Sequence, residues 1–312
     1  MVQLFKILNS AAIEIEKPAD AVWVNLVPPF KDEEFQELSK TLDIPIEFLR
    51  DSLDIDERPR YEVEDEVRFI VIKTPAENNS FNDSDAYYIT IPICIILTRH
   101  QIITVNSFDN DAIKKFLGTF QKRNPDKRNI MVLKIFEKVV QNFMDFLKEI
   151  NNRRNTYEQK LYDSNRNEEL LTLMRIQKSL LYFVTALRSN ELLMIKLERT
   201  NFLSLNDDER EILNDLIVET SQALEMANIY TNILSSTLDA FASIISNNLN
   251  NVMKRLTSIT IILSFPSLVA SIYGMNVAIP YANAPHAFYT PVILSIVVSV
   301  IIAWYFMKKK WF

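Results

Sequence analysis

The stretch NILSSTLDAFASIISNNLNNVMKRLTSITIILSFPSLVASIYGMN, residues 232–276, decides the fold of this 312-residue chain. Lys254 and Arg255 stand in its middle, and the 52 residues that follow them, 256–307, contain no Asp, Glu, Lys or Arg. Residues 256–273 and 288–307 are each mostly apolar and close to the roughly 20 residues that a helix needs to cross a bilayer. Two transmembrane helices are therefore predicted, and a simple soluble protein is excluded.

A polar face runs through the same stretch. Alternating steps of four and three residues from Asn232 reach twelve positions, eleven of which are Asn, Asp, Ser or Thr. The other 28 positions between 232 and 271 hold only six such residues, so the pattern is not a drift in composition. We call the twelve positions the polar seam: Asn232, Ser236, Asp239, Ser243, Ser246, Asn250, Met253, Thr257, Thr260, Ser264, Ser267 and Ser271.

A period of 3.5 residues is typical of a helix face that is shared with other helices. Two interpretations remain open: small polar side chains pack membrane helices tightly without water, or the seam lines a water-filled conduit. The conduit is favoured because the face stays polar for roughly 60 Å at the helical rise. Two spans cannot enclose a path, so a conduit implies an oligomer with this helix around its axis. Met253 would then form a hydrophobic constriction, or else it fills a packing gap.

Long helices are predicted upstream, because residues 126–265 contain neither Gly nor Pro. Breaks are expected at 162–167 and 200–209, and the run from Asn206 to Glu209 is typical of a capping box that opens a new helix. That helix would continue for some 65 residues, about 100 Å, and become the first span. Gly274 stands at its end, where a residue able to leave right-handed helical geometry is expected.

The first 125 residues have a different texture, with β-rich runs at 22–26, 67–74, 87–97 and 101–107 and helical stretches at 31–42 and 45–53. The predicted class is an α+β membrane protein. Its parts are an N-terminal α/β domain at 1–125, a helical stalk or coiled coil at 126–255, a transmembrane helix at 256–273, an external loop at 274–287, a second transmembrane helix at 288–307 and a basic tail at 308–312.

The basic residues predict the orientation. They flank the two spans at Lys254, Arg255 and 308–310, and the loop between the spans has neither Lys nor Arg. A multi-pass protein of the plasma or inner membrane is expected, with both termini in the cytosol. Aromatic residues near the span ends are interpreted as anchors at the two interfaces with water: Trp304, Tyr305 and Trp311 inside, and Tyr273, Tyr281 and Tyr289 outside.

Composition excludes several functions. The 29 basic and 40 acidic residues before Lys254 give that part a formal charge of −11, which disfavours nucleic-acid binding. A single cysteine, Cys94, excludes a disulfide framework, and with two distant histidines it disfavours a zinc site. We find no pairing of a nucleophile with a base and no phosphate-binding glycine loop, so neither enzymatic activity nor an organic cofactor is expected.

Four short runs carry a resemblance to a known family. They are WVNL at 23–26, ERPR at 57–60, NxxMKxLT at 250–257 and, most specifically, YGMN at 273–276. Together with the long helix and the two final spans, they make the chain similar to the CorA family of magnesium transporters over most of its length.

The resemblance implies a homopentamer with a cytosolic α/β domain, which conducts Mg²⁺ and often Co²⁺ and Ni²⁺. It implies a selectivity filter of Gly274, Met275 and Asn276, whose amide oxygens bind the water shell of an ion that dehydrates reluctantly. It also implies closure by cytosolic Mg²⁺, so that Mg²⁺ is both the transported and the regulatory ion. The residues implicated in conduction, from the seam and the family together, are Asp239, Ser243, Ser246, Asn250, Thr257, Thr260, Ser264, Ser267 and Ser271 along the pore, Met253 and Leu256 at a hydrophobic gate, and Asp215 at the regulatory site.

Alternatives stay open for some of these roles. Asp215 is otherwise a solvated residue near the start of a helix. The loop at 277–287 contains no acidic residue, unlike the loop of many family members. Cations are therefore expected to be concentrated less at the outer mouth of the conduit than in those relatives. Competing functions are a zinc transporter of the related branch and a membrane-tethered scaffold or sensor that conducts nothing. The partners expected in every case are a lipid bilayer and further copies of the chain.

Overall fold

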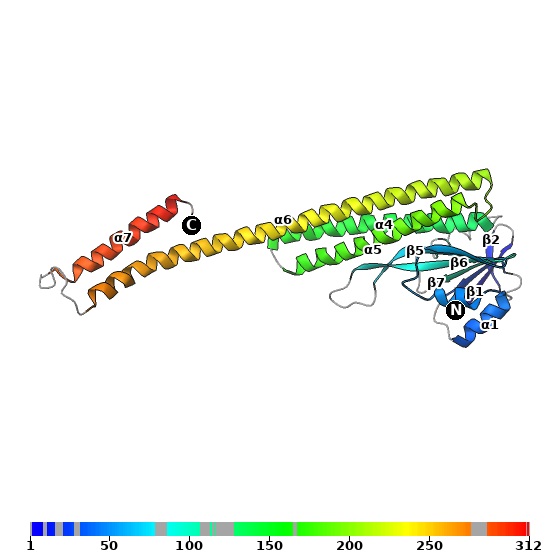
Figure 1. Ribbon diagram of the computed structural model, residues 1–312, viewed down its shortest axis with the longest axis horizontal. Coiled ribbons are helices and arrows are strands. Elements are labelled where there is room, and N and C mark those ends of the chain that lie inside the picture. The colour runs from blue at the N-terminus through cyan, green and yellow to red at the C-terminus, as the bar shows by residue number, and fades with distance from the viewer. Residues whose placement is uncertain are drawn as a thin grey trace. The chain divides into compact units, whose positions relative to one another are not determined.

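The computed structural model describes residues 2–8, 11–15, 21–27, 32–78, 86–106, 113, 116, 128–164, 167–275, 286–309 and 311. It divides into two compact units, Met1–Ser235 and Ser236–Phe312. Helix α6, Asp207–Tyr273, starts in the first unit and ends in the second without a break (Figure 1). The predicted domain limits stay predictions, and the limit at 125 lies outside the described residues.

The first unit is built on a seven-stranded sheet in the order β2-β1-β3-β7-β6-β5-β4. Strands β3 and β7 are parallel, and every other neighbouring pair is antiparallel. The central strands are buried almost throughout, because helices cover both faces of the sheet. The strands are β1 Val2–Leu8, β2 Ala11–Glu14, β3 Trp23–Leu26, β4 Arg60–Glu64, β5 Val67–Glu77, β6 Tyr88–Leu97 and β7 Ile102–Asn106.

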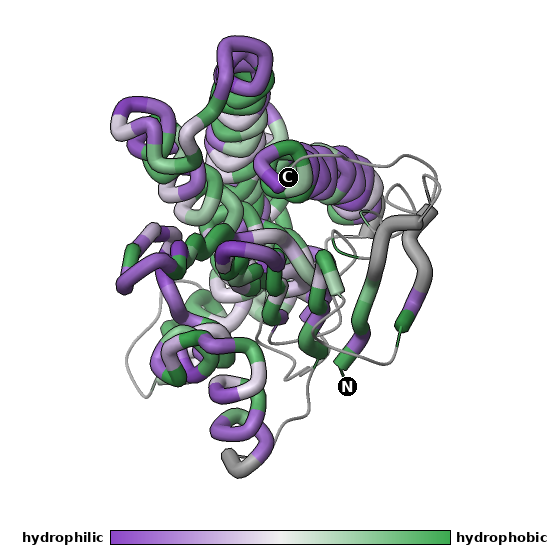
Figure 2. Tube along the Cα trace, turned by 90° about the vertical axis from the view of Figure 1, so that its right-hand side faces the viewer, coloured by the Kyte–Doolittle hydropathy of each residue, from purple (hydrophilic) through white to green (hydrophobic). Residues whose placement is uncertain are grey.

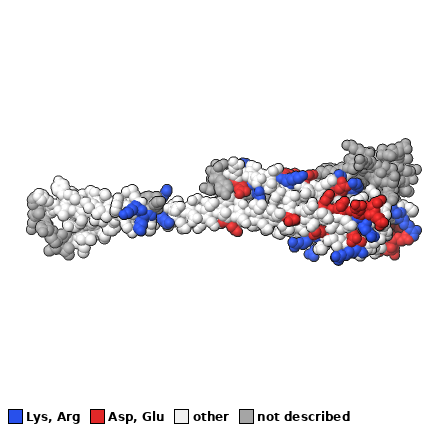
Figure 3. All heavy atoms as spheres, turned by 90° about the horizontal axis from the view of Figure 1, so that it is seen from above, with Lys and Arg blue, Asp and Glu red and all other residues white. Residues whose placement is uncertain are grey.

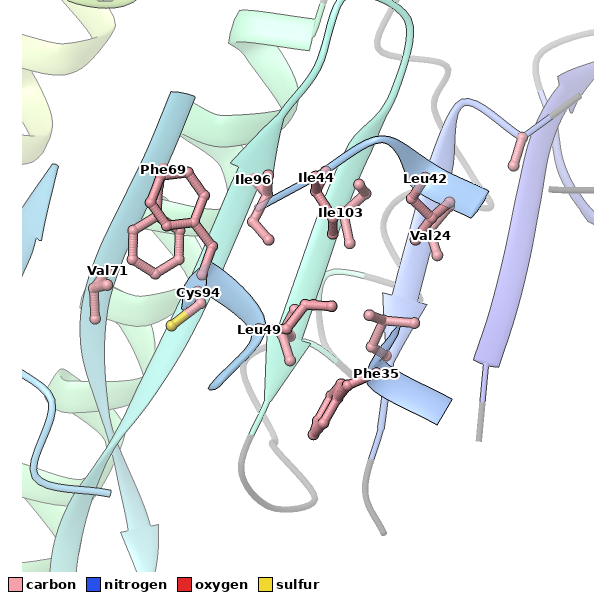
Figure 4. Close-up of a cluster of buried hydrophobic side chains, with 14 of the residues drawn as sticks. Val24, Phe35, Leu42, Ile44, Leu49, Phe69, Val71, Cys94, Ile96 and Ile103 are labelled. Carbon is pink, nitrogen blue, oxygen red and sulfur yellow. The ribbon is translucent and has the colours of Figure 1, made fainter. Parts of the chain in front are cut away.

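Helices α1, Asp32–Leu42, and α2, Ile46–Asp51, cover one face of this sheet. Their apolar side chains meet those of the strands in a buried cluster that includes Phe35, Leu49 and Cys94 (Figure 4). The rings of Phe48 and Phe69 stack there with centroids 4.5 Å apart. Burial of such side chains is the main term that stabilises this layer.

Helices α4, Arg128–Ser164, and α5, Asn167–Arg199, form a hairpin on the other face. The ring of Tyr88 on β6 lies edge-on to Phe146 of α4, with centroids 5.1 Å apart. Ser179 of α5 accepts a hydrogen bond of 3.0 Å from the Tyr88 amide. Seen along the helices, hydrophobic and hydrophilic residues lie on different sides of the turns, as expected of helices with one buried face (Figure 2).

The polar contact that fixes α5 most specifically joins Asn190 to Lys73 on β5. The Lys73 amide donates to Asn190 Oδ1 at 3.0 Å, and Asn190 Nδ2 donates to the Lys73 carbonyl at 2.7 Å. Strand β4 pairs with β5 only as far as Arg60 opposite Val71, so Lys73 lies beyond the end of β4. The Asn190 amide therefore satisfies two backbone groups that the sheet leaves unpaired.

Most of the predicted elements are confirmed. The four β-rich runs are β3, β5, β6 and β7, the two helical stretches are α1 and α2, and the two expected breaks separate α4, α5 and α6. The capping box is formed: Asn206 Oδ1 accepts from the Glu209 amide at 2.8 Å, and Glu209 Oε2 accepts from the Asn206 amide at 3.0 Å. Strands β1, β2 and β4 were not predicted; β4, with the sequence RYEVE, is an edge strand with only two apolar residues, Tyr61 and Val63, of which Val63 is exposed.

The second unit holds the end of α6 and helix α7, Tyr289–Lys308. Both helices are long and apolar enough to cross a membrane, and so is α5. In the most apolar 18-residue stretch of α5, 39% is buried, whereas only 6% is buried in the corresponding stretches of α6 and α7. Packing on the sheet therefore explains the apolar side chains of α5. The second unit thus leaves its apolar surface open, as expected of helices that lipid or other subunits surround.

Gly274 was expected because a residue there would leave right-handed helical geometry, and this reason was wrong. The residue does not adopt a positive φ, and its amide still donates to the Ala270 carbonyl at 2.9 Å, so the helical pattern continues through it. A Cβ at this position would lie 3.2 Å from the Ala270 oxygen, which is tighter than ordinary contact. Glycine is therefore favoured here by the close approach of the helix's own carbonyl rather than by left-handed geometry.

Candidate ion-conduction site

The polar seam is uncovered along its whole length: all twelve of its side chains are exposed. No part of the chain that the structure describes packs over them, although α7 lies beside the same helix. Side chains that are small and polar, and that face neither a core nor a neighbouring helix of the same chain, are available to water or to another copy.

Helix α7 packs on a different face of α6. The residues of the first span that are buried or half-buried form a separate stripe, whose centre lies roughly 150° around the helix from the seam at 100° per residue. Its members are Ser258, Ile261, Ile262, Phe265, Pro266, Val269 and Tyr273. The pairing of the two spans therefore leaves the side chains of the seam exposed. Leu268 and Ile272, which lie off the seam as well, remain exposed.

Three hydroxyl groups of the seam are oriented by their own helix. Ser264 Oγ donates to the Thr260 carbonyl at 2.7 Å, Thr260 Oγ1 donates to the Leu256 carbonyl at 2.8 Å, and Ser243 Oγ donates to the Asp239 carbonyl at 3.1 Å. A hydroxyl has one proton and two lone pairs, so each of these oxygens turns only acceptor sites outward. Such a surface binds the outward-pointing protons of a hydrated cation and disfavours an anion.

The seam carries one formal charge. Asp239 is exposed, and no acidic residue follows it in the sequence. A single carboxylate on a face of otherwise neutral acceptors attracts a cation, and copies of it in an oligomer would concentrate that attraction at one level of the axis.

The two residues predicted to form a hydrophobic gate are both exposed, Met253 at 52% and Leu256 at 57%. Leu256 is the third residue after Met253, which places it roughly 60° around the helix from Met253. Met253 belongs to the seam, and Leu256 lies beside it. Neither side chain fills a gap inside the described part of the chain, so the packing role considered for Met253 is not found within one copy.

The tripeptide predicted to select the ion follows the end of α6. Gly274 and Met275 are exposed, Met275 at 57%. The Met275 amide donates to the Ile272 carbonyl at 3.3 Å, so the chain is still held to the helix at this point. Asn276 lies outside the described residues.

Asp215, the predicted regulatory residue, is exposed on α6. Steps of three and four residues back from Asn232 lead to it, and every position on the way is exposed as well: Ile229, Glu225, Gln222 and Val218. Among the described residues no group of three or more His, Cys, Asp or Glu side chains lies close enough to hold a metal. Asp215 therefore has, in the described part of the chain, no set of further ligands to complete a metal site.

The sequence analysis missed one contact between the spans. Pro266 lies inside α6 and has no amide proton for the Ile262 carbonyl four residues earlier. Ser299 Oγ of α7 donates to that carbonyl at 3.3 Å. A proline within a predicted span always leaves such a carbonyl, and the hydroxyls of the second span were the available signal.

The run at 57–60 is structural: Arg60 pairs with Asp51 at 2.8 Å and also with Glu57.

Curated relatives match nearly the whole chain. The chain is 27% identical over 296 residues to the cobalt/magnesium transport protein CorA of Methanocaldococcus jannaschii, covering 93% of this chain and 91% of the relative. It is 22% identical over 295 residues to the cobalt/magnesium transport protein CorA of Thermotoga maritima, covering 93% and 83%.

Solved structures agree with this. The complete structure of the CorA magnesium transporter from Methanocaldococcus jannaschii superposes with a TM-score of 0.86 at 25% identity and covers 100% of this chain and 99% of that one. The full-length CmaX protein shares the fold, with a TM-score of 0.75 at 17% identity and coverage of 100% and 98%. The family model of the CorA-like Mg²⁺ transporter protein matches residues 18–309. The chain therefore belongs to the CorA-like Mg²⁺ transporter family.

Proposed function

We propose that this protein is a channel for divalent cations that admits Mg²⁺, and also Co²⁺ and Ni²⁺, down the membrane potential. The relatives are named as cobalt/magnesium transport proteins, which supports Mg²⁺ and Co²⁺, and Ni²⁺ is taken from the family resemblance. At an interior-negative potential of 100 mV, each elementary charge gains about 2.3 kcal/mol on entry, so a divalent ion gains about twice that. No further energy source is required for uptake.

The observation that carries this proposal is the uncovered seam. A face that stays polar through a membrane helix, and that the second span of the same chain leaves free, needs water or a copy of itself against it. Because the seam's hydroxyls turn acceptors outward, the ion that suits it is a cation that keeps its water shell. Mg²⁺ fits, since it dehydrates reluctantly.

Selection is assigned to Gly274, Met275 and Asn276. A ring of Asn276 amide oxygens would bind the protons of the hydrated ion at the outer mouth. Thr257, Thr260, Ser264, Ser267 and Ser271 would then pass the hydrated ion through the membrane, and Ser243, Ser246, Asn250 and Asp239 would lead it into the cytosol. Both termini are cytosolic in this arrangement.

An oligomer follows from the same geometry, because a face on one helix encloses no path. We take the number of subunits, five, from the family resemblance. The exposed side chains of Val218 and Ile229 on the first half of α6 support association with further copies, since nothing in the described part of the chain covers them.

Two alternatives remain for comparison. A zinc transporter of the related branch would be expected to depart from the GMN tripeptide that this chain carries at 274–276. A scaffold that conducts nothing would need neither the continuous seam nor Asn276. The outward acceptors and the uncovered seam favour conduction.

Uptake of Mg²⁺ into liposomes that contain the purified protein tests the proposal, with and without an inside-negative potential. We expect uptake driven by the potential, abolished by Asn276→Ala while assembly is retained. Asn283→Ala, in the same loop but outside the tripeptide, is the matched control and should conduct normally. Normal flux through Asn276→Ala would show that Asn276 does not select the ion. If assembled wild-type protein passed no Mg²⁺, Co²⁺ or Ni²⁺, the result would favour the scaffold function.

The gate makes a separate prediction. Met253→Gly should raise the basal conductance at high internal Mg²⁺ by at least severalfold, because a ring of methionines closes a pore by excluding water. Single-channel or flux measurements at fixed potential check this, with Val252→Ala, an equally exposed neighbour off the seam, as the control. An unchanged closed state in Met253→Gly would count against the gate.

A further inference from the structure

The basic residues of the second unit gather at one end of its two apolar stretches, 256–273 and 288–307. They are Lys254, Arg255 and 308–310, of which the first four are described, and the single acid of this unit is Asp239. We call Lys254, Arg255, Lys308 and Lys309 the basic patch. In Figure 3 the Lys and Arg atoms of this unit form one group that borders an uncharged region.

The basic patch has no ion-pair partner among the residues that the structure describes. All four of its side chains are exposed, and no ion pair found among the described residues includes any of them. Asp239 is 15 residues before Lys254, about 22 Å along the helix, which is more than twice the Debye length of roughly 8–10 Å at physiological salt. The four positive charges are therefore not neutralised by the unit itself.

Aromatic rings place the patch at the depth of lipid headgroups. Lys308 Nζ lies 5.2 Å from the ring centroid of Trp304, and the ring of Trp311 stacks on Phe306 at 5.2 Å. The Trp311 amide donates to the Phe306 carbonyl at 3.1 Å, which turns the chain back along α7. Tryptophan side chains concentrate at the boundary between hydrocarbon and water, so the ammonium groups beside them lie at the level of phosphates.

We propose that the basic patch binds the phosphate group of an anionic phospholipid in the leaflet at this end of the two helices. Arg255 offers the planar pair of donors that suits phosphate, and the three lysines add charge around it. The proposal depends on α6 and α7 spanning the membrane and does not depend on which ion the protein conducts.

Tryptophan fluorescence tests this directly in the full-length protein. The chain has three tryptophans; Trp304 and Trp311 lie beside the patch, while Trp23 is fully buried in the first unit and supplies a constant background. The protein is reconstituted in phosphatidylcholine vesicles that contain a fixed fraction of lipid brominated on its acyl chains. The bromolipid is either phosphatidylglycerol or phosphatidylcholine, and the ratio of quenching measures preference for the anionic lipid.

We expect quenching by brominated phosphatidylglycerol to exceed that by brominated phosphatidylcholine at equal mole fraction. Neutralising Lys254, Arg255, Lys308 and Lys309 to Gln should bring the ratio to one, and each pair alone should lower the relative association constant roughly fivefold or more. Lys40→Gln with Lys148→Gln, two exposed lysines of the first unit, is the control and should leave the ratio unchanged.

Three results would overturn the proposal. The first is a ratio of one in the wild-type protein, and the second is a preference that survives in both paired variants. The third is displacement by inorganic phosphate beyond the effect of chloride at equal ionic strength, which would assign the patch to a soluble anion. Mg²⁺ uptake in pure phosphatidylcholine vesicles, measured in parallel, separates a failure of this proposal from a failure of the channel function.

Discussion

The side-chain amide of Asn190 takes the place of a strand beside Lys73. Its carbonyl oxygen and its NH₂ group occupy the positions that a neighbouring backbone would fill, at 3.0 and 2.7 Å. Asn190 is 1% exposed, so water cannot replace it. Each buried backbone group left without a partner costs about 1–3 kcal/mol.

Asn190→Ala should therefore destabilise the first unit by about 2–5 kcal/mol. For a unit of this size that corresponds to a fall in Tm of roughly 4–15 °C, which thermal unfolding of the full chain measures. Asn152→Ala, an exposed asparagine on α4, is the control and should shift Tm very little. An equal shift for both variants would show that the contact with Lys73 contributes nothing.

The buried thiol of Cys94 gives a prediction for pH. Burial raises the pKa of Cys94 to about 12 from 9.0. At pH 8 the folded protein should react with a thiol reagent at least a thousandfold more slowly than the chain unfolded in urea, because the thiolate is the reactive form. Ionisation favours the unfolded chain, so the stability contributed by the neutral thiol is present below pH 9 and is lost between pH 9 and 12. Rapid labelling at pH 8 without denaturant would contradict this.

At the scale of elements, the pairing of α6 with α7 depends on a carbonyl freed by proline. Pro266 cannot donate to Ile262, and Ser299 does so instead from the other helix. In hydrocarbon no water is available to make that bond. One hydroxyl thus compensates for a proline on the partner span and fixes the register of the two helices.

Ser299→Ala should lower the thermal stability of the reconstituted protein by about 0.5–2 kcal/mol, because the Ile262 carbonyl loses its donor. In a Pro266→Ala background the amide of residue 266 can bond that carbonyl, so the same change should cost clearly less. A double-mutant cycle on Tm measures the coupling. Ser295→Ala, whose hydroxyl bonds the Val292 carbonyl of its own helix, is the control. Additive effects of Ser299→Ala and Pro266→Ala would exclude the proposed compensation.

The elements that the sequence predicted share a strong local signal. Strands β5, β6 and β7 are runs of Ile and Val, and α6 opens at a capping box and contains no glycine. Strand β4 carries charged residues on an exposed edge, so its pairing with β5 depends on the partner rather than on its own pattern. The contacts of Asn190 and Ser299 join residues far apart in the chain, which periodicity cannot reveal.

At the scale of the whole molecule, one face of α6 is exposed in the single copy. Positions three or four residues apart are exposed from Asp215 to Ser271, and every side chain between Ala242 and Thr257 is exposed as well. The sequence shows which positions of α6 are small and polar, and their place along a pore stays a prediction. It could not predict the ligands that complete a regulatory site at Asp215, because they would come from another subunit.

Asp215→Asn is expected to weaken inhibition by internal Mg²⁺ severalfold while leaving the maximal flux unchanged. A neutral amide binds a divalent ion less strongly than a carboxylate does. Flux into vesicles loaded with graded Mg²⁺ concentrations measures the inhibition, with Glu37→Gln, an exposed acid on α1, as the control. Identical inhibition curves for Asp215→Asn and wild type would remove Asp215 from the regulatory site.

The apolar character of α5 has a consequence for how the chain is made. Strand β7 ends at Asn106, and α5 begins at Asn167, about 60 residues later. At roughly 5–20 residues per second, the complete set of strands is synthesised some 3–12 s before α5 starts to emerge. A preformed sheet can then withdraw α5 from the insertion machinery, which would otherwise receive it as a span. Asn190→Ala, which weakens that docking, should increase the share of newly made chains whose α5 is protected from protease by membrane vesicles.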